Sequence, residues 1–341
     1  MGKIEITGMN WNGKKTLVTG ADGFIGSHLT EALIRRGADL TALAQYNSFD
    51  SYGWLDDLPA DIRENTRLKR GDIRDAQQMA RLCESQDVVF HLAALIAIPY
   101  SYEAAASYVE TNVRGTLNLL EATRRNGLER FIQTSTSEVY GTAQTRPIAE
   151  THPLQAQSPY AASKIGADMM ALSFARSFDL PVVVLRPFNT YGPRQSERAV
   201  ISTVIRQFLD PSCETVCTGD STPKRDFNFV ADTVSAFMAI AASDSVESGE
   251  TYNAGSGTMV SIGEMIDLVR DITGSNKPVA QESQRLRPAD SEVMELQADA
   301  GRLRDATGWR SEVDLRDGLS RTIDWWRCRV AKARPDSRYL V

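Results

Sequence analysis

The chain has 341 residues, of which 42% are hydrophobic and 24% charged, and its formal net charge is -6. This composition is typical of a soluble globular protein of about two domains and excludes the disordered and fibrous classes. The mild negative charge comes without any Lys/Arg-rich run, so we expect neither nucleic acid nor membrane as a partner.

The cysteines and the N-terminal region indicate the compartment. The four cysteines are few for the length, which fits a reducing environment. Cys213 and Cys217 have no second pair or nearby His to complete four zinc ligands, so we expect no metal. The first 12 residues are polar, and no run of about 18 apolar residues occurs, which predicts a cytoplasmic protein.

Short apolar runs alternate with helical patterns through the first half of the chain. The predicted strands cover residues 16–19, 40–44, 67–70, 88–91, 130–134 and 182–186. The predicted helices cover residues 24–36, 75–84, 104–126 and 160–178. This order is typical of parallel strands joined by helices that cover both faces of the sheet. It predicts an α/β fold with a Rossmann-type doubly wound parallel sheet in residues 1–188.

The second half of the chain does not continue this alternation of strand and helix patterns. Gly-Pro at 192–193, Thr-Pro at 222–223 and Gly-Ser-Gly at 255–257 break it into short pieces. We therefore expect residues 189–341 to form mainly a smaller α/β substrate-binding lobe. A helical pattern at 231–242 can return to the sheet, so the Rossmann domain is expected to receive residues 228–250 as well.

A glycine-rich loop directly follows the first predicted strand and runs into a predicted helix. Glycines let the backbone approach a pyrophosphate, whose charge is met by N–H groups at the helix N-terminus. The order of strand, loop and helix is the context that identifies a dinucleotide-binding motif. The loop residues expected at the cofactor are Gly20, Gly23, Phe24, Ile25 and Gly26.

The residues after the second strand leave the choice of dinucleotide open. An acidic residue about 20 positions after the loop would bind the ribose of NAD, but residues 44–48 read Ala-Gln-Tyr-Asn-Ser, with neither a carboxylate nor an Arg. Asp72 follows the third strand and is a candidate acceptor for the adenine amino group, although an Asp there is also an ordinary helix N-cap. We expect NAD and keep NADP as the alternative.

Tyr160 and Lys164 form a Y-x-x-x-K pattern at the start of a predicted helix, so their side chains lie one turn apart on one face. The segment 135–141, Ser-Thr-Ser-Glu-Val-Tyr-Gly, ends the fifth strand, where ligands bind in open parallel sheets. A neighbouring ammonium favours the phenolate, so we expect Lys164 to lower the pKa of Tyr160 and make it a base.

Taken together, these motifs make the chain resemble the extended short-chain dehydrogenase/reductase family over nearly its full length. The motifs are TGADGFIGSHL at 19–29, GDIRD at 71–75, HLAA at 91–94, TNVRGT at 111–116, STSEVYG at 135–141, SPYAASK at 158–164 and RPFNTYGPR at 186–194. The chain is most similar to nucleotide-sugar 4,6-dehydratases, in particular bacterial N-acetylglucosamine nucleotide dehydratases of legionaminic acid-type pathways. Residues 46–49, 53–56 and 152–160 point there.

The resemblance implies two sets of binding residues and a partner. The cofactor set gains Asn47, Asp72, Ile73, Leu92, Ala93, Ala94, Asn112, Tyr160 and Lys164. The substrate set is Asn189, Arg194, Arg225 and Arg287. The forked guanidinium groups of the three arginines suit diphosphate oxygens. The partner is a nucleotide-diphosphate sugar, and the helices at 104–126 and 160–178 would form the four-helix bundle of a homodimer.

The resemblance also implies a reaction that uses five catalytic residues: Thr136, Ser137, Glu138, Tyr160 and Lys164. Tyr160 takes the proton of the sugar 4-hydroxyl while Thr136 hydrogen-bonds the same oxygen. The 4-ketone acidifies the C5 hydrogen, which Glu138 removes. Water is lost across C5 and C6, and hydride returns to C6. UDP- or GDP-N-acetylglucosamine would thus become a 4-keto-6-deoxy sugar.

One position keeps alternative reactions open. Ser137 stands where dTDP-glucose dehydratases carry an acidic Asp, although GDP-mannose dehydratases also have Ser there. Glu138 or a water held by Ser137 is then the acid for the C6 hydroxyl. UDP-glucuronate-type decarboxylases share the Thr-Ser-Glu motif and are the first alternative. A C4 epimerase is the second, disfavoured by Glu138, because epimerases usually have small residues here.

Overall fold

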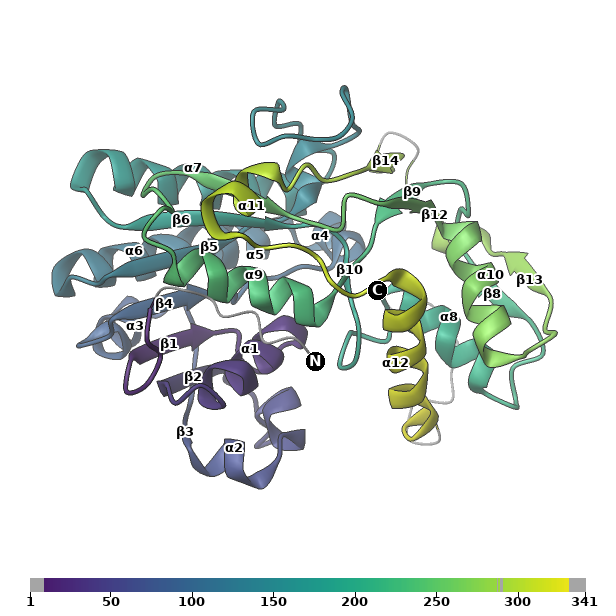
Figure 1. Cartoon of the computed structure of the whole chain (residues 1–341), viewed down its shortest axis with the longest axis horizontal. Coiled ribbons are helices and arrows are strands. Elements are labelled where there is room, and N and C mark those ends of the chain that lie inside the picture. The colour runs from purple at the N-terminus through teal and green to yellow at the C-terminus, as the bar shows by residue number, and fades with distance from the viewer. Residues whose placement is uncertain (1–8, 287, 289–290, 331–341) are drawn as a thin grey trace.

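The computed structural model describes residues 9–286, 288 and 291–330. Its centre is a seven-stranded parallel sheet in the order β11-β6-β5-β4-β1-β2-β3, seen at the left of Figure 1. The strands are β1 (Lys15–Thr19), β2 (Asp39–Gln45), β3 (Thr66–Gly71), β4 (Val88–His91), β5 (Arg130–Thr134), β6 (Val182–Pro187) and β11 (Thr251–Ala254). The six predicted strands are confirmed to within one residue at each end, as is the Rossmann-type fold class.

The sheet is covered on both faces because neighbouring strand residues point to opposite sides. Leu17 of β1 packs with α3 (Ala76–Cys83), α6 (Gly115–Asn126) and α7 (Pro159–Phe178). Val18, the next residue, packs with α1 (Phe24–Ile34) and α9 (Val230–Ala242). Both residues are fully buried. These two layers make the sheet the rigid base of the molecule.

The chain returns to the sheet through two elements of its second half. Helix α9 packs against α1, β5 and β6, and β11 pairs in parallel with β6 from Thr251↔Val184 to Ala254↔Pro187. Sequence analysis anticipated the helix but not the strand. The four-residue segment of β11, Thr-Tyr-Asn-Ala, is too short and too polar for the sequence to predict a buried strand there.

The predicted helix at 104–126 is confirmed as an unbroken helical segment from Ala105 to Asn126, but it contains a π-helical turn that the sequence did not predict. The chain forms α4 (Ile98–Glu103), α5 (Ala105–Tyr108), a π-helical turn (Val109–Arg114) and then α6. The turn holds Asn112, which accepts a hydrogen bond from Leu95 N (2.8 Å) and donates to Leu95 O (2.9 Å) and Ser163 Oγ (2.9 Å). The wider turn therefore ties the segment after β4 to α7.

The smaller lobe lies at the right of Figure 1, and its last helix, α12 (Leu315–Arg327), lies on the side of the lobe toward the sheet. It contains α8 (Val200–Leu209), β8 (Val216–Thr218), β9 (Lys224–Asp226), β12 (Met259–Ser261), α10 (Ile262–Thr273), β13 (Val279–Gln281), β14 (Glu295–Leu296) and α12 (Leu315–Arg327). Strand β9 pairs with β12 and β14, and β8 pairs with β13.

A buried carboxylate fixes the position of β9. Asp226 accepts hydrogen bonds from Ser256 N (2.8 Å), Gly257 N (2.9 Å) and Ala298 N (3.0 Å), and from Ser256 Oγ (2.6 Å). A buried charge is tolerated only when its acceptor sites are used in this way. The preceding residue, Arg225, is thereby held at the edge of the lobe that faces the sheet.

Candidate active site

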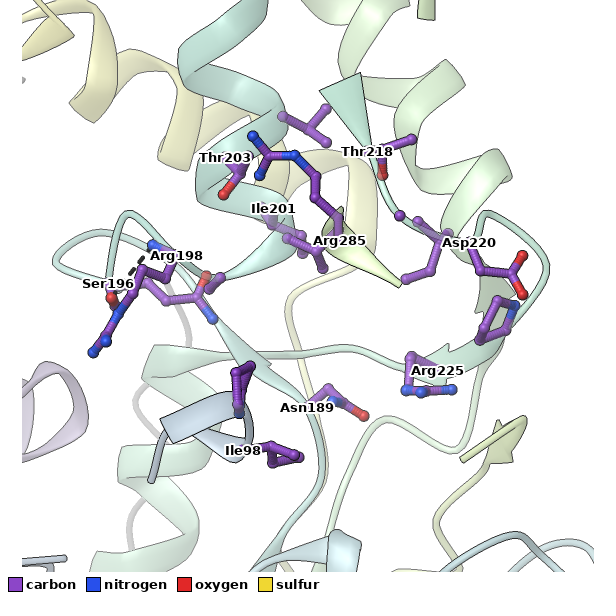
Figure 2. Close-up of a pocket in the computed structure, with 18 of the residues that line it drawn as sticks. Ile98, Asn189, Ser196, Arg198, Ile201, Thr203, Thr218, Asp220, Arg225 and Arg285 are labelled. Atoms are coloured by element: carbon purple, nitrogen blue, oxygen red, sulfur yellow. Dashed lines mark hydrogen bonds between the residues drawn. The ribbon is translucent and has the colours of Figure 1, made fainter. Parts of the chain in front are cut away.

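Two hollows meet where the sheet faces the smaller lobe. The larger, of about 890 Å³, runs along the carboxyl ends of the strands, and the smaller, of about 390 Å³, lies toward the lobe. Glu138 and Asn189 line both. We call the larger hollow the cleft and the smaller one the cavity; Figure 2 shows the cavity.

The glycine loop forms one wall of the cleft and depends on two of its glycines. Gly20 has φ +66°, and a Cβ there would lie 2.7 Å from Ala93 N. A Cβ at Gly26 would lie 2.1 Å from Gly20 O. No side chain among the described residues caps the N-terminus of α1 after Gly23. The loop therefore presents backbone N–H groups and a helix N-terminus, a site suited to a pyrophosphate.

Most residues predicted for a dinucleotide line the cleft: Gly20, Gly23, Phe24, Ile25, Gly26, Asp72, Ile73, Leu92, Ala93, Ala94, Tyr160 and Lys164. Asn47 does not. Its side-chain amide donates to Gln45 O (3.2 Å) and Ser51 O (2.9 Å), so it organises its own loop. Gln45 and Trp54 line the cleft there instead. Asn112 is also absent from the lining, because its amide holds Leu95.

Asp72 does not cap helix α3, although its position after the third strand suggested that it could. The N-cap of α3 is Asp75, whose Oδ1 accepts from Gln77 N and Gln78 N. Asp72 instead pairs with Arg74, and the hydrogen bond from the Arg74 guanidinium lowers the pKa of the Asp72 carboxyl. Asp72 is thus held as a carboxylate on the wall of the cleft.

Lys164 and Tyr160 lie at the floor of the cleft and are nearly inaccessible to solvent. Lys164 Nζ donates to Thr134 O at 2.6 Å, and burial lowers the pKa of Lys164 to about 8, opposed by the charge of Asp168. Burial raises the pKa of Tyr160; a hydrogen bond with Thr136 lowers it, and the charge of Glu138 raises it further. The expectation of a lowered pKa for Tyr160 is therefore wrong for the free protein, because desolvation of the phenolate dominates.

Thr136, Ser137 and Glu138 emerge from the end of β5 in a tight 3-10 turn (Ser137–Tyr140). Thr136 caps this turn, with its Oγ1 accepting from Glu138 N at 3.2 Å. Ser137 is 2% exposed, whereas Glu138 is half-buried at the junction of the cleft and the cavity. The five predicted catalytic residues therefore line one cleft.

The histidines lie outside both hollows. His91 is buried, with Nδ1 2.8 Å from Thr19 Oγ1 and Nε2 3.0 Å from Thr116 Oγ1. Burial lowers the pKa of His91 to about 3 and that of His28 to about 4. Both are uncharged at neutral pH and join structural elements, His28 through Pro193 O at 2.9 Å.

The cavity is lined by aliphatic side chains on one part of its wall and by polar and charged side chains on the rest. In the view of Figure 2, Asn189 lies between Ile98 and Arg225, and Arg285 extends toward Thr203. Asn189 Oδ1 is buried and has no hydrogen-bond partner among the described residues. An orphaned acceptor of this kind indicates a site that a polar ligand completes.

The arginines divide between the two hollows. Arg225 lines the cavity, 6% exposed, and donates to Glu292 Oε1 at 2.8 Å. Arg285, which sequence analysis missed, also lines it and donates from Nε to Glu282 Oε2 at 2.6 Å. Arg194 lines the cleft and not the cavity, and it pairs with Glu31 of α1 at 2.8 Å. Arg287 lies outside the described residues.

The described part of the chain contains no group of three or more His, Cys, Asp or Glu side chains placed to hold a metal ion. Within that same part, each helix is too short or too polar to cross a bilayer.

Comparison with known proteins places this geometry in a family. A family model described as GDP-mannose 4,6 dehydratase matches residues 17–322. A dTDP-glucose 4,6-dehydratase of Actinoplanes sp. is 33% identical over 319 residues, covering 92% of this chain and 98% of that protein. A UDP-N-acetyl-alpha-D-glucosaminuronate decarboxylase of Bacillus cytotoxicus is 33% identical over 325 residues, covering 92% and 98%.

A solved structure agrees with the relatives. The dTDP-glucose 4,6-dehydratase DesIV of Streptomyces venezuelae, solved with NAD bound, has a TM-score of 0.84 and 31% identity, covering 94% of this chain and 99% of that one. Fold and site therefore define an extended short-chain dehydrogenase/reductase. The chain belongs to the GDP-mannose 4,6 dehydratase family.

Proposed function

We propose that this protein is an NAD-dependent nucleotide-sugar 4,6-dehydratase acting on a UDP- or GDP-linked N-acetylglucosamine. The observation that carries the proposal is Glu138. Its half-buried carboxylate lines both hollows beside Thr136 and Tyr160. A carboxylate at this place is suited to removing a carbon-bound proton from the sugar after oxidation, which the elimination of water requires and epimerisation at C4 does not.

The cleft fits a dinucleotide. The uncapped N-terminus of α1 would receive the pyrophosphate, Asp72 and Ile73 the adenosine end, and Tyr160 and Lys164 the nicotinamide end. When bound, NAD accepts a hydride from C4 of the sugar and returns it at C6. Arg70 and Arg74 are paired with Asp50 and Asp72, which favours NAD over the additional phosphate of NADP.

The first task of the chain is to take the proton of the sugar 4-hydroxyl. Tyr160 is the base, and its hydrogen bond with Thr136 stabilises the phenolate. Because burial raises the pKa of Tyr160, the free protein holds the phenol protonated at neutral pH. The nearby Lys164 ammonium then becomes essential, since a positive charge in a desolvated site favours the phenolate.

The second task is to move a proton from C5 to the departing C6 hydroxyl. The ketone at C4 makes the C5 hydrogen acidic, and the Glu138 carboxylate accepts it as a proton. Ser137 has no readily lost proton to give, because a hydroxyl has a high pKa. The Glu138 carboxyl therefore passes its proton to the C6 oxygen as the C6–O bond breaks, and water leaves with no net change at Glu138. As hydride is added at C6, C5 takes a proton supplied by the medium, which balances the proton that Tyr160 took from the 4-hydroxyl.

Substrate binding is assigned to the cavity. Asn189 supplies an unpaired acceptor, and Arg225 a buried guanidinium for the diphosphate. The aliphatic side chains of Ile201 and Val204 form the remaining wall for the nucleoside. We keep Arg287 in the substrate set on the resemblance alone.

The reaction is tested by incubating the protein and NAD with UDP-, GDP- and dTDP-linked sugars and measuring product mass. We expect loss of one water from an N-acetylglucosamine nucleotide. Loss of carbon dioxide from UDP-glucuronate would instead establish the decarboxylase, and an unchanged mass with inverted C4 would establish the epimerase.

Glu138→Gln separates oxidation from elimination. The amide has no base to remove the C5 proton, so turnover should fall by about 10²-fold or more, the scale of one general base. Reduced cofactor should still form, visible by its absorbance, while exchange of the C5 hydrogen with deuterated water is lost. Normal turnover by Glu138→Gln would remove Glu138 as the base.

Glu292→Gln tests the role of Arg225. Glu292 competes with a diphosphate for the Arg225 guanidinium, so its neutralisation should tighten binding of UDP or GDP roughly 3- to 10-fold, the scale of one hydrogen bond of about 1 kcal/mol. Calorimetry measures the Kd. Glu295→Gln, which removes a carboxylate paired with Arg146 outside the cavity, is the control and should change nothing. Weaker binding by Glu292→Gln would mean that the pair positions Arg225 for the ligand.

A further inference from the structure

A third ionisable residue lies on the same face of α7 as the two that line the cleft. Tyr160, Lys164 and Asp168 follow one another at intervals of four residues, so they share one face of the helix. Asp168 is 0% exposed and lines neither hollow. It therefore touches no ligand, and any part it has in the reaction acts through its neighbours.

Asp168 is bonded to the strand end that supplies the reacting groups. Its Oδ2 accepts from Ser135 Oγ at 2.6 Å. Ser135 stands between Thr134, whose carbonyl accepts from Lys164 Nζ, and Thr136, which bonds Tyr160. One carboxylate oxygen thus fixes the backbone that holds the lysine on one side and the threonine on the other.

The same carboxylate continues into a buried network. Arg186 of β6 donates to Asp168 Oδ2 from Nε (3.3 Å) and from its terminal nitrogen (3.2 Å). The Arg186 guanidinium also donates to Tyr140 Oη at 3.0 Å, and Tyr140 Oη donates to Asn253 Oδ1 at 2.7 Å. Tyr140 ends the turn that carries Glu138. The network therefore reaches both halves of the catalytic centre.

Asp168 supplies the negative charge that offsets the two positive charges of this buried cluster. Lys164 and Arg186 are buried cations, and Asp168 is the carboxylate that the structure sets against them. The other titratable groups near this cluster are Tyr160 on α7, which Glu138 of the 3-10 turn faces, and His91 on β4, which burial keeps neutral. With Asp168 neutralised, two cations would remain buried together. Arg keeps its proton under all ordinary conditions, so Lys164 would lose its own.

We propose that Asp168 is a positioning residue that keeps Lys164 in its ammonium form and fixes the end of β5 that presents Thr136. The proposal rests on the proposed function in one respect: the ammonium matters because it supports proton transfer at Tyr160. Burial lowers the pKa of Lys164 to about 8, and the charge of Asp168 opposes that shift. A further decrease in this pKa would deprotonate Lys164 near neutral pH.

The test reads the charge of Lys164 directly, in cofactor-free protein. The chain has eight lysines, so protein labelled with ¹³C at lysine Cε gives a simple spectrum, and the Lys164 resonance is the one missing from Lys164→Met. In Asp168→Asn we expect the titration midpoint of Lys164 to fall by at least about one pH unit, since an opposite charge at close range is worth that much.

Two variants of Arg186 keep the test decisive if Asp168→Asn does not fold. Arg186→Gln removes the competing cation while Asp168 stays, so the Lys164 midpoint should rise. Arg186→Lys retains the charge and should leave the midpoint where it is. Opposite shifts in Asp168→Asn and Arg186→Gln support the proposal. An unchanged or higher midpoint in Asp168→Asn, or an unchanged or lower midpoint in Arg186→Gln, would overturn it.

An activity measurement adds the functional consequence. The alkaline limb of kcat/KM should move to lower pH in Asp168→Asn by the amount seen in the titration. Ser135→Ala removes one hydrogen bond but no charge, so it should lower kcat without moving the limb. If the titration shifts while none of the nucleotide sugars is turned over, the proposed function fails and the role of Asp168 stands.

Discussion

The hydrogen bond from the Lys164 ammonium to the Thr134 carbonyl is the interaction on which this site depends. It joins α7 to the end of β5 inside the protein, where a charge is costly unless it is paired. Tyr160 lies one turn before Lys164, and Thr136 and Glu138 follow Thr134 by two and four residues. The geometry of the proposed oxidation and elimination is therefore set by one junction between a helix and a strand.

Burial at this junction produces the electrostatics of the site. Desolvation raises the pKa of Tyr160 and lowers that of Lys164, so both groups are displaced toward their neutral forms. Strongly perturbed pKa values of this kind cluster at functional sites, where burial and neighbouring charges act on the same groups. Positive charge entering the cleft would favour the phenolate, whereas water entering it would relax both shifts.

Local motifs were enough to predict the half of the site that the sheet carries. The glycine loop, Tyr160, Lys164 and the segment 135–141 each stand beside a strong strand or helix pattern, so their meeting at one sheet edge follows from parallel topology. The remainder depends on contacts between distant segments. Asp168 meets Arg186 across two elements, Arg225 meets Glu292 across the lobe, and Arg194 turns toward Glu31 of α1. A single sequence carries no signal for these pairings, nor for the desolvation that raises the pKa of Tyr160.

The central claim is that oxidation at C4 is followed by reduction at C6, and a label transferred between these carbons tests it most directly. The protein would be given a nucleotide-linked N-acetylglucosamine that carries deuterium at C4, and the product would be analysed by NMR. A 4,6-dehydratase moves the deuterium to the new C6 methyl group, and this is the result we expect. Deuterium found again at C4, as an epimerase would leave it, would contradict the account.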